Sequence, residues 1–299
     1  MTKIIPNKTT FYIAKFITML SCLLIMRDVS LFSKENLQNL IAREISKPHL
    51  CSDEVITNPL RSDGFGGQFQ SIIYSVIYAE MNKKKYLYTP FKNMEHNYNN
   101  ENDFVSKKEQ FINFIHHFEI NEDLNIQSSM DLHDQMNFFE NNLTNCANCD
   151  SLKKLKIIFK ENKNKSDYFN DSHKNIAVHI RRPNPHDNRI EGTNTSDNLY
   201  TKIISFLRDY YSSEKPLFHI YSQGDTEYFQ NNFAGNDIVF HMNESIEQTF
   251  ASMVFADVLV TGTSSFSYTA GLLSDAQVYY IPFWHPPLPH WIPVNFISF

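Results

Sequence analysis

A pair of arginines directly after an apolar run is the feature of the sequence best suited to bind a diphosphate. In VHIRRP (residues 178–183), Arg181 and Arg182 follow a predicted strand without an intervening turn. The planar guanidinium group donates two parallel hydrogen bonds that match the oxygens of a phosphate. Arg181 and Arg182 are therefore candidates for diphosphate binding, with ordinary surface charges, and Arg182 paired to a carboxylate, as the alternative. His179, inside the strand, suits an orienting or packed role.

A cluster of small hydroxyl residues follows a later predicted strand. In TGTSSFSY (residues 261–268), Thr263, Ser264, Ser265 and Phe266 stand where a helix would begin. Backbone N–H groups and the dipole at a helix N-terminus favour an anion, and hydroxyl groups add further donors. These four residues are candidates for phosphate binding, with ordinary capping of the helix as the alternative.

Two further stretches could complete a nucleotide site. SDGFGGQFQSI (residues 62–72) contains Gly64, Gly66 and Gly67, three of the eight glycines in the chain, and Gln68 follows them. Glycine lets the main chain approach a ligand without a Cβ clash, so all four residues are candidates for donor binding. In YSQGDTEYF, Asp225 could bind a ribose or a base edge, or simply cap a helix.

Candidates for proton transfer lie in YTPFKNMEHNYNN (residues 88–100), after a predicted strand. Glu95 and His96 could each accept a proton from a hydroxyl group, although a surface loop is an equal alternative. Near the C-terminus, Trp284 and His285 could form a platform on which a sugar stacks, or could pack the end of the chain.

The elements that must position these residues alternate between strand and helix. Strands are predicted at 175–180, 217–222, 237–242, 257–262 and 277–283, and helical periodicity separates them. This alternation predicts a parallel, doubly wound α/β sheet. Ligands of such sheets bind at the carboxyl ends of the strands, so the loops after three of these strands should line one edge. Upstream, the pattern predicts a helix over 68–81 and a strand over 83–90.

Several function classes are excluded by pattern and composition. The chain has neither a G-x-G-x-x-G nor a G-x-x-x-x-G-K-[ST] motif, which argues against dinucleotide oxidoreductases and P-loop kinases. Its net charge is -6 and its pI is about 6.0, so we expect no nucleic-acid partner. Cys146 and Cys149 form a lone C-x-x-C, which predicts a local disulfide or two free thiols rather than a zinc site.

The N-terminal segment from Phe11 to Met26 has 16 mostly apolar residues. Its length lies between a signal peptide and a membrane span of about 20 residues. We favour an uncleaved signal-anchor, with a cleaved signal or a buried helix as alternatives. An anchor would place the catalytic part in the lumen of the secretory pathway, at a Golgi-type membrane; without one, the chain would be cytoplasmic.

Taken in order, the motifs GFGGQFQ, VHIRRP and FASMVFADVLVTGTSSFSYTAGLL resemble those of a family. They are similar to the fucosyltransferases of the GT-B fold, the superfamily of α1,2-, α1,6- and protein-O-fucosyltransferases. The last segment most resembles the bacterial-type α1,2 group. The resemblance spans roughly residues 60–285 and is strong in these three blocks.

The resemblance implies two Rossmann-like domains that face a cleft. An N-terminal anchor or helix with a stem would occupy residues 1–50, an acceptor-side domain residues 51–170, and a nucleotide-sugar-binding domain residues 171–299. It implies GDP-fucose as the donor substrate, a glycan or glycoprotein as the acceptor, inversion at the anomeric centre, and no cofactor or bound metal.

The resemblance also implies roles for individual residues. Arg181 would hold the β-phosphate and steady the leaving group, with support from Arg182, and His179 would shape the donor pocket. Ser264 and Ser265 match the phosphate-binding turn of the family.

Three features depart from the family pattern. Pro183 and Asn184 follow the arginine pair, where relatives commonly have glycine and aspartate. Gly67 stands where relatives usually carry asparagine, and Thr249 stands where several carry an acidic residue for the nucleotide. Two alternatives therefore stay open: an inactive relative that binds glycans, and a transferase that uses a different nucleotide sugar.

Overall fold

The computed structural model describes residues 52–122, 131–169, 171–182 and 195–297. The signal-anchor predicted at residues 11–26 lies outside this part of the chain. Within the described ranges, no helix combines the length and the apolar character needed to cross a membrane.

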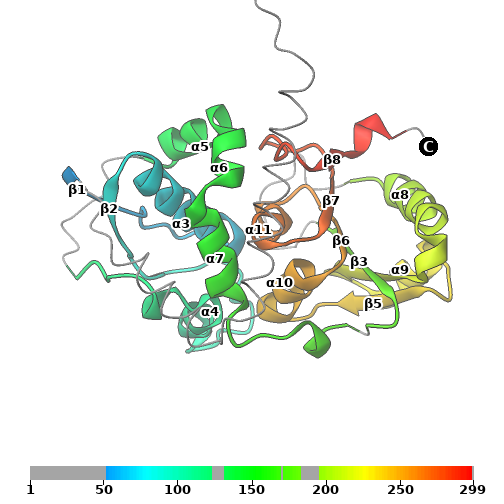
Figure 1. Cartoon of the computed structure of the whole chain (residues 1–299). Helices are drawn as coiled ribbons and strands as arrows, with labels where there is room; N and C mark the ends of the chain where they lie inside the picture. Colours follow the sequence, from blue (N-terminus) through cyan, green and yellow to red (C-terminus); the bar gives the residue numbers. More distant parts are fainter. Residues whose placement is uncertain (1–51, 123–130, 170, 183–194, 298–299) are drawn as a thin grey trace, which may run out of the picture. The chain divides into compact units, whose positions relative to one another are not determined.

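The C-terminal half is built on a parallel sheet with six strands among the described residues, in the order β5-β4-β3-β6-β7-β8 (Figure 1). The strands are β3 (Lys174–Ile180), β4 (Pro216–Ser222), β5 (Ile238–Met242), β6 (Val258–Val260), β7 (Gln277–Tyr280) and β8 (Ile292–Pro293). From β3 the chain proceeds outward to β5 and then returns to β6 on the other side of β3. The strand order therefore reverses between β3 and β6, which is where ligands bind in open parallel sheets.

Alternate residues of β3 enter two hydrophobic cores on opposite faces of the sheet. Ile176, Val178 and Ile180 pack in one core, and Ala177 packs in the other. The helices of this half are α8 (Asp197–Tyr210), α9 (Thr226–Asn232), α10 (Ile246–Phe255) and α11 (Ser265–Leu273). Side chains of α8 and α9 belong to the first core, and those of α10 and α11 belong to the second. An apolar strand covered on both faces in this way gives three layers, as the sequence predicts.

The N-terminal half contains a smaller sheet and more helix. β1 (Ser52–Thr57) and β2 (Lys84–Leu87) pair in parallel as a two-stranded sheet. The helices are α3 (Phe65–Met81), α4 (Phe104–Ile112), α5 (Leu132–Asn141), α6 (Leu143–Asn148) and α7 (Asp150–Lys160). Short 3-10 turns lie at η1 (Phe114–His116), η2 (Lys165–Asp167), η3 (Ser212–Glu214) and η4 (Val294–Phe296). A Rossmann-like domain is predicted for this half, and its described residues form this two-stranded sheet with its helices.

One aromatic cluster joins the two halves. Phe65 and Phe69 of α3 pack against Phe250 of α10, with ring centroids 5.2 and 5.7 Å apart. Phe266 of α11 packs against the same Phe250 ring at 5.4 Å. The hydrophobic core therefore continues across the domain boundary that is predicted at residue 170, and it holds the beginnings of α3 and α11 together.

The sequence-based boundaries agree with the structure in most places. The five strands predicted in the C-terminal half correspond to β3, β4, β5, β6 and β7, although β7 ends at Tyr280 rather than at Phe283. Helix α3 begins at Phe65, three residues before its predicted start at Gln68, because two glycines are part of its first turn. The C-x-x-C pair consists of free thiols, and burial raises the pKa of Cys146 to about 12.

Candidate functional site

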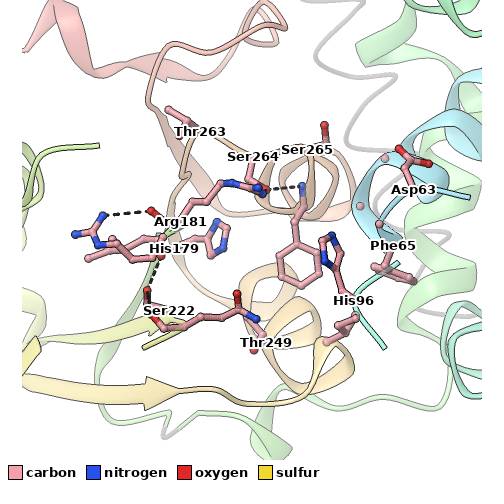
Figure 2. A pocket seen from close by; sticks show the side chains of 18 of the residues that line it. Asp63, Phe65, His96, His179, Arg181, Ser222, Thr249, Thr263, Ser264 and Ser265 are labelled. Carbon is pink, nitrogen blue, oxygen red and sulfur yellow. Dashed lines mark hydrogen bonds between the residues drawn. The ribbon is translucent and has the colours of Figure 1, made fainter. Parts of the chain in front are cut away.

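A cavity opens at the point where the strand order of the large sheet reverses (Figure 2). We call it the central cavity. It is lined by Asp63, Gly64, Phe65, Gly66, Gly67, His96, Tyr98, His179, Ile180, Arg181, Arg182, Ser222, Gln223, Glu244, Ser245, Ile246, Thr249, Thr263, Ser264, Ser265, Phe266, Phe283 and Trp284. The carboxyl ends of β3, β4 and β6 and the first turn of α3 all contribute. The four stretches predicted to form a nucleotide site therefore meet in one place.

Arg181 is the cation that the end of β3 delivers to this cavity. Its Nη1 atom lies 3.5 Å from Ser264 Oγ, and Figure 2 shows the side chain reaching toward the beginning of α11. Arg181 directly follows β3, which is buried on both faces and so anchors the backbone before this residue. A guanidinium in this place can donate to an anion that also contacts the start of α11.

Arg182 has a different environment although it is the next residue. Its guanidinium forms an ion pair with Asp197, the first residue of α8, and donates to the backbone oxygens of Arg181 (3.2 Å) and Thr195 (3.1 Å). Tyr228 also donates a hydrogen bond to Asp197. These contacts engage both terminal nitrogens of Arg182, so it supports the loop and Arg181 provides the charge for a ligand.

The beginning of α11 has the geometry of an anion site. Ser264 is its N-cap, and its Oγ accepts a hydrogen bond from Phe266 N at 3.2 Å. The turn that precedes it is tight, because a Cβ on Gly262 would stand 2.8 Å from His179 O. The first-turn N–H groups of a helix have no partner within the helix, and the helix dipole adds positive potential there.

The beginning of α3 lies directly against the beginning of α11. A Cβ on Gly66 would stand 2.5 Å from Phe266 Cα and 2.6 Å from Phe266 N. Thr269 of α11 donates a hydrogen bond to Gly66 O at 3.1 Å. The N-cap of α3 is Gly64, which adds no side-chain cap. Two helix N-termini and Arg181 therefore converge on one cavity, and together they favour a ligand with two or more negative charges.

Gly64 allows a close approach by His96. A Cβ on Gly64 would stand 2.8 Å from both Cδ2 and Nε2 of His96. The other ring nitrogen, Nδ1, lies 2.6 Å from Tyr98 Oη. His96 also has a left-handed backbone, with φ of 72°, which is uncommon for a residue other than glycine. The predicted candidate His96 is thus held at the cavity, with its Nε2 beside the glycine loop.

Asp63 is a cavity residue that the sequence analysis missed. Its carboxylate forms an ion pair with Arg61, in which Arg61 Nε donates to Oδ1 at 2.8 Å. A Cβ on Gly67 would stand 2.4 Å from Asp63 Oδ2. Position 67 therefore has no side chain, and the carboxylate of Asp63 fills the space.

Burial keeps His179 uncharged. Desolvation, and then the positive charge of Arg181, lower the pKa of His179 to about 3. Its ring packs against Phe266 with centroids 5.7 Å apart, and a Cβ on Gly262 would stand 3.0 Å from its Nδ1. A neutral imidazole adds no charge to the cavity, so His179 shapes the wall beside Arg181.

The opposite wall carries a carboxylate held by a histidine pair. Glu244 accepts a hydrogen bond from His241 Nδ1 at 2.8 Å, and His241 Nε2 lies 3.0 Å from Nδ1 of His219. Thr249 lines the same wall. Glu247 lines the adjoining groove, where it forms an ion pair with Lys108 at 2.8 Å. Glu244 is therefore the acidic side chain that this wall offers in the neighbourhood of Thr249.

Three of the residues predicted to bind the donor or to transfer a proton do not line the central cavity, and neither does His285. Gln68 is buried and donates to the backbone oxygens of Asp63 (2.5 Å) and Asn93 (2.8 Å), so it joins the glycine loop to the segment before His96. Asp225 caps α9 by accepting from Glu227 N at 3.1 Å. Glu95 is exposed, and its backbone N–H contacts Asp63 O at 3.4 Å. Among the residues that the structure describes, no group of three or more His, Cys, Asp or Glu side chains is arranged for a metal ion.

Among known proteins, similarity is found to solved structures only. No protein-family model and no curated protein sequence matches the chain. It is similar to the α1,6-fucosyltransferase NodZ co-crystallised with GDP, at 12% identity over 78% of this chain and 96% of that chain, with a TM-score of 0.42. A structure of fucosyltransferase NodZ from Bradyrhizobium has 11% identity over 75% of this chain and 94% of that chain, with a TM-score of 0.40. POFUT1 in complex with GDP-fucose has 10% identity over 80% of this chain and 100% of that chain, with a TM-score of 0.42.

Proposed function

We propose that the chain is a glycosyltransferase that takes its sugar from a GDP-sugar, with GDP-fucose as the donor. One observation carries the proposal: Arg181 and the N-termini of α3 and α11 converge on the cavity at the reversal point of the sheet. Such an arrangement complements the diphosphate of a nucleotide sugar. The motifs in which these residues stand are the ones that resemble the fucosyltransferases.

The diphosphate is the leaving group of the proposed reaction. The bond between the anomeric carbon and the β-phosphate oxygen breaks, and the negative charge that develops on that oxygen lies near Arg181 and the first turn of α11. Donors that are already oriented toward the developing charge stabilise the transition state more than the ground state. GDP then leaves with this charge, and a metal ion is not required for the step.

The acceptor hydroxyl must lose its proton as its oxygen bonds to the anomeric carbon. Asp63 directly precedes Gly64, His96 lies against Gly64, and both line the cavity, so each is available to an acceptor that enters there. We assign the role of general base to Asp63, because its carboxylate lines the cavity and Arg61 holds it in place. Attack from the side opposite to the diphosphate inverts the anomeric centre.

The nucleoside would lie toward β4 and α10. Ser222, Gln223, Glu244 and Thr249 line this part of the cavity. A carboxylate such as that of Glu244 can accept two hydrogen bonds from the N1–H and the 2-amino group of guanine, which favours GDP over other nucleotides. A purine without the 2-amino group would lose one of them.

A nucleotide-sugar screen by thermal shift tests the proposal. We expect GDP and GDP-fucose to raise the melting temperature of the wild-type protein, and Arg181→Ala to abolish the shift. The control is Arg208→Ala, because Arg208 pairs with Asp237 and does not line the central cavity. A stronger response to UDP or ADP would support a different nucleotide sugar, and the absence of any response to a nucleotide would refute the proposal.

Release of GDP from GDP-fucose separates an enzyme from an inactive relative. The active form should release GDP slowly to water and faster when an acceptor is present. Binding of GDP without any release, with an acceptor panel present, would favour the inactive glycan-binding alternative.

A further inference from the structure

The loop after β7 presents an exposed indole to the central cavity. Trp284 lines the cavity, yet 63% of its surface is exposed, whereas the other tryptophan, Trp291, is 4% exposed. Phe283 stacks against Trp284, with ring centroids 4.6 Å apart and planes inclined by 28°. Together they form an aromatic surface at the mouth of a polar cavity. Apolar surface in such a place is typical of a ligand-binding region.

Both sides of Trp284 are held in place by hydrogen bonds. Tyr280 accepts a hydrogen bond from Phe283 N at 3.0 Å and donates one to His285 O. The His285 ring is buried, and its Nδ1 lies 3.1 Å from a carboxylate oxygen of Glu140. The residues before and after Trp284 are thus fixed to the body of the protein. A ligand that stacks on the indole does not need to order this loop, which reduces the entropy lost on binding.

The lining of the central cavity also includes polar and charged side chains. Asp63, His96 and Tyr98 line the same cavity, and Glu244 lies on its other wall. Of the two arginines, Arg182 is paired with Asp197, and Arg181 lies at the proposed diphosphate site. An acceptor with its own negative charge would therefore find neither arginine available as a partner, whereas a neutral acceptor needs none.

We propose that Trp284 is the acceptor subsite and that the acceptor is a glycan ending in a neutral pyranose. This inference rests on the proposed function. The pyranose has one face of C–H groups, which stacks on the indole, and a rim of hydroxyl groups, which faces Asp63 and His96. One hydroxyl oxygen bonds to the anomeric carbon of the donor, the bond from that carbon to the β-phosphate oxygen breaks, and the hydroxyl proton passes to Asp63.

A printed glycan array, probed with labelled protein in the presence and absence of GDP, tests the subsite. We expect the wild-type protein to bind glycans with a neutral terminal pyranose, and Trp284→Ala to reduce the signal at least tenfold. Trp284→Phe should retain part of it, since a smaller aromatic face remains. The matched control is Tyr210→Ala: Tyr210 on α8 is 64% exposed, much like Trp284, and it does not line the cavity. This variant should bind as the wild type does.

The thermal shift with GDP, measured on the same preparations, distinguishes two kinds of failure. If GDP raises the melting temperature and no glycan binds, the acceptor subsite is wrong and the proposed function stands. If GDP has no effect but Trp284-dependent glycan binding persists, the subsite stands and the donor assignment is wrong. Equal binding by Trp284→Ala and wild type, or a preference for sialylated glycans, would overturn the inference.

Discussion

The contact between the first turns of α3 and α11 leads to a sharp prediction for Gly66→Ala. The new Cβ would stand 2.5 Å from Phe266 Cα, and ordinary contact begins at 3.4 Å, so the helix ends must separate by about 0.9 Å. The neighbours are backbone atoms of α11, which cannot turn aside as a long side chain can. The separation therefore moves the two sets of N–H groups relative to each other.

The magnitude follows from the hydrogen bonds that a bound diphosphate would make. A displacement of about 0.9 Å stretches a hydrogen bond from about 2.9 Å to about 3.8 Å, beyond the useful range. Loss of one hydrogen bond to a charged group costs about 1.5–3 kcal/mol. At about 1.4 kcal/mol for each factor of ten, the affinity for GDP should fall by roughly 10- to 100-fold. The free energy of unfolding should change less, because overpacking costs about 1–3 kcal/mol while alanine favours a helix by about 1 kcal/mol over glycine.

The assay is calorimetric titration with GDP, supported by urea unfolding of each variant. Gly271→Ala is the matched control: Gly271 is in the same helix α11, and a Cβ there would stand 2.9 Å from the Trp291 ring, away from the cavity. It should show a comparable loss of stability and an unchanged affinity for GDP. If Gly66→Ala folds and binds GDP as tightly as the wild-type protein, the reasoning about the paired helix ends is wrong.

Three further predictions follow from the cavity and its supports. Burial lowers the pKa of His179 to about 3 and that of His219 to about 4, both below the value of 6.5 for the unfolded chain, so the stability that they contribute is complete above pH 6.5 and is lost as the pH falls. At pH 5 each histidine should lower the free energy of unfolding by about 2 kcal/mol relative to pH 7. Urea unfolding at the two pH values measures this, and an unchanged free energy would contradict it. Asp63→Asn should lower the rate of sugar transfer by about 100-fold or more with little change in GDP affinity. The control Asp225→Asn, which alters the cap of α9, should leave the rate unchanged. Equal transfer rates for the two variants would show that Asp63 is not the general base. Arg182→Ala should lower the free energy of unfolding by about 2 kcal/mol through loss of its bonds to Asp197 and Thr195, and a larger effect on GDP affinity than that of Arg181→Ala would reverse the roles of the two arginines.

Much of the candidate site could be predicted because the pattern of a doubly wound sheet places chemistry at strand ends. Arg181 follows β3 and Ser264 follows β6, and the reversal of strand order lies between these two strands. The apolar periodicity of strands and helices is local, so it identifies which loops meet at one edge. The cluster of glycines makes Gly66 a candidate, and the close contact with Phe266 explains why this position has no side chain.

The remaining features depend on contacts that no local pattern records. The sequence leaves open whether Arg182 binds a phosphate or pairs with a carboxylate, and only the fold identifies Asp197 as its partner. Gln68 was expected at the donor, but its amide holds Asp63 and Asn93 together. The sequence does not point to Asp63, because its place in the cavity depends on the space that Gly67 leaves. These assignments need the packed loop, since a residue's neighbours in space decide them.

The central claim is that Arg181 and two helix N-termini bind the diphosphate of a guanine nucleotide. Calorimetric titration of GDP, and of guanosine monophosphate for comparison, into the wild-type protein and Arg181→Ala tests it most directly. We expect the wild-type protein to bind GDP more tightly than guanosine monophosphate. Arg181→Ala should lower the affinity for GDP at least tenfold and should bring the affinities for the two nucleotides closer together. Equal affinities of the two proteins for GDP, or no binding by the wild type, would contradict it.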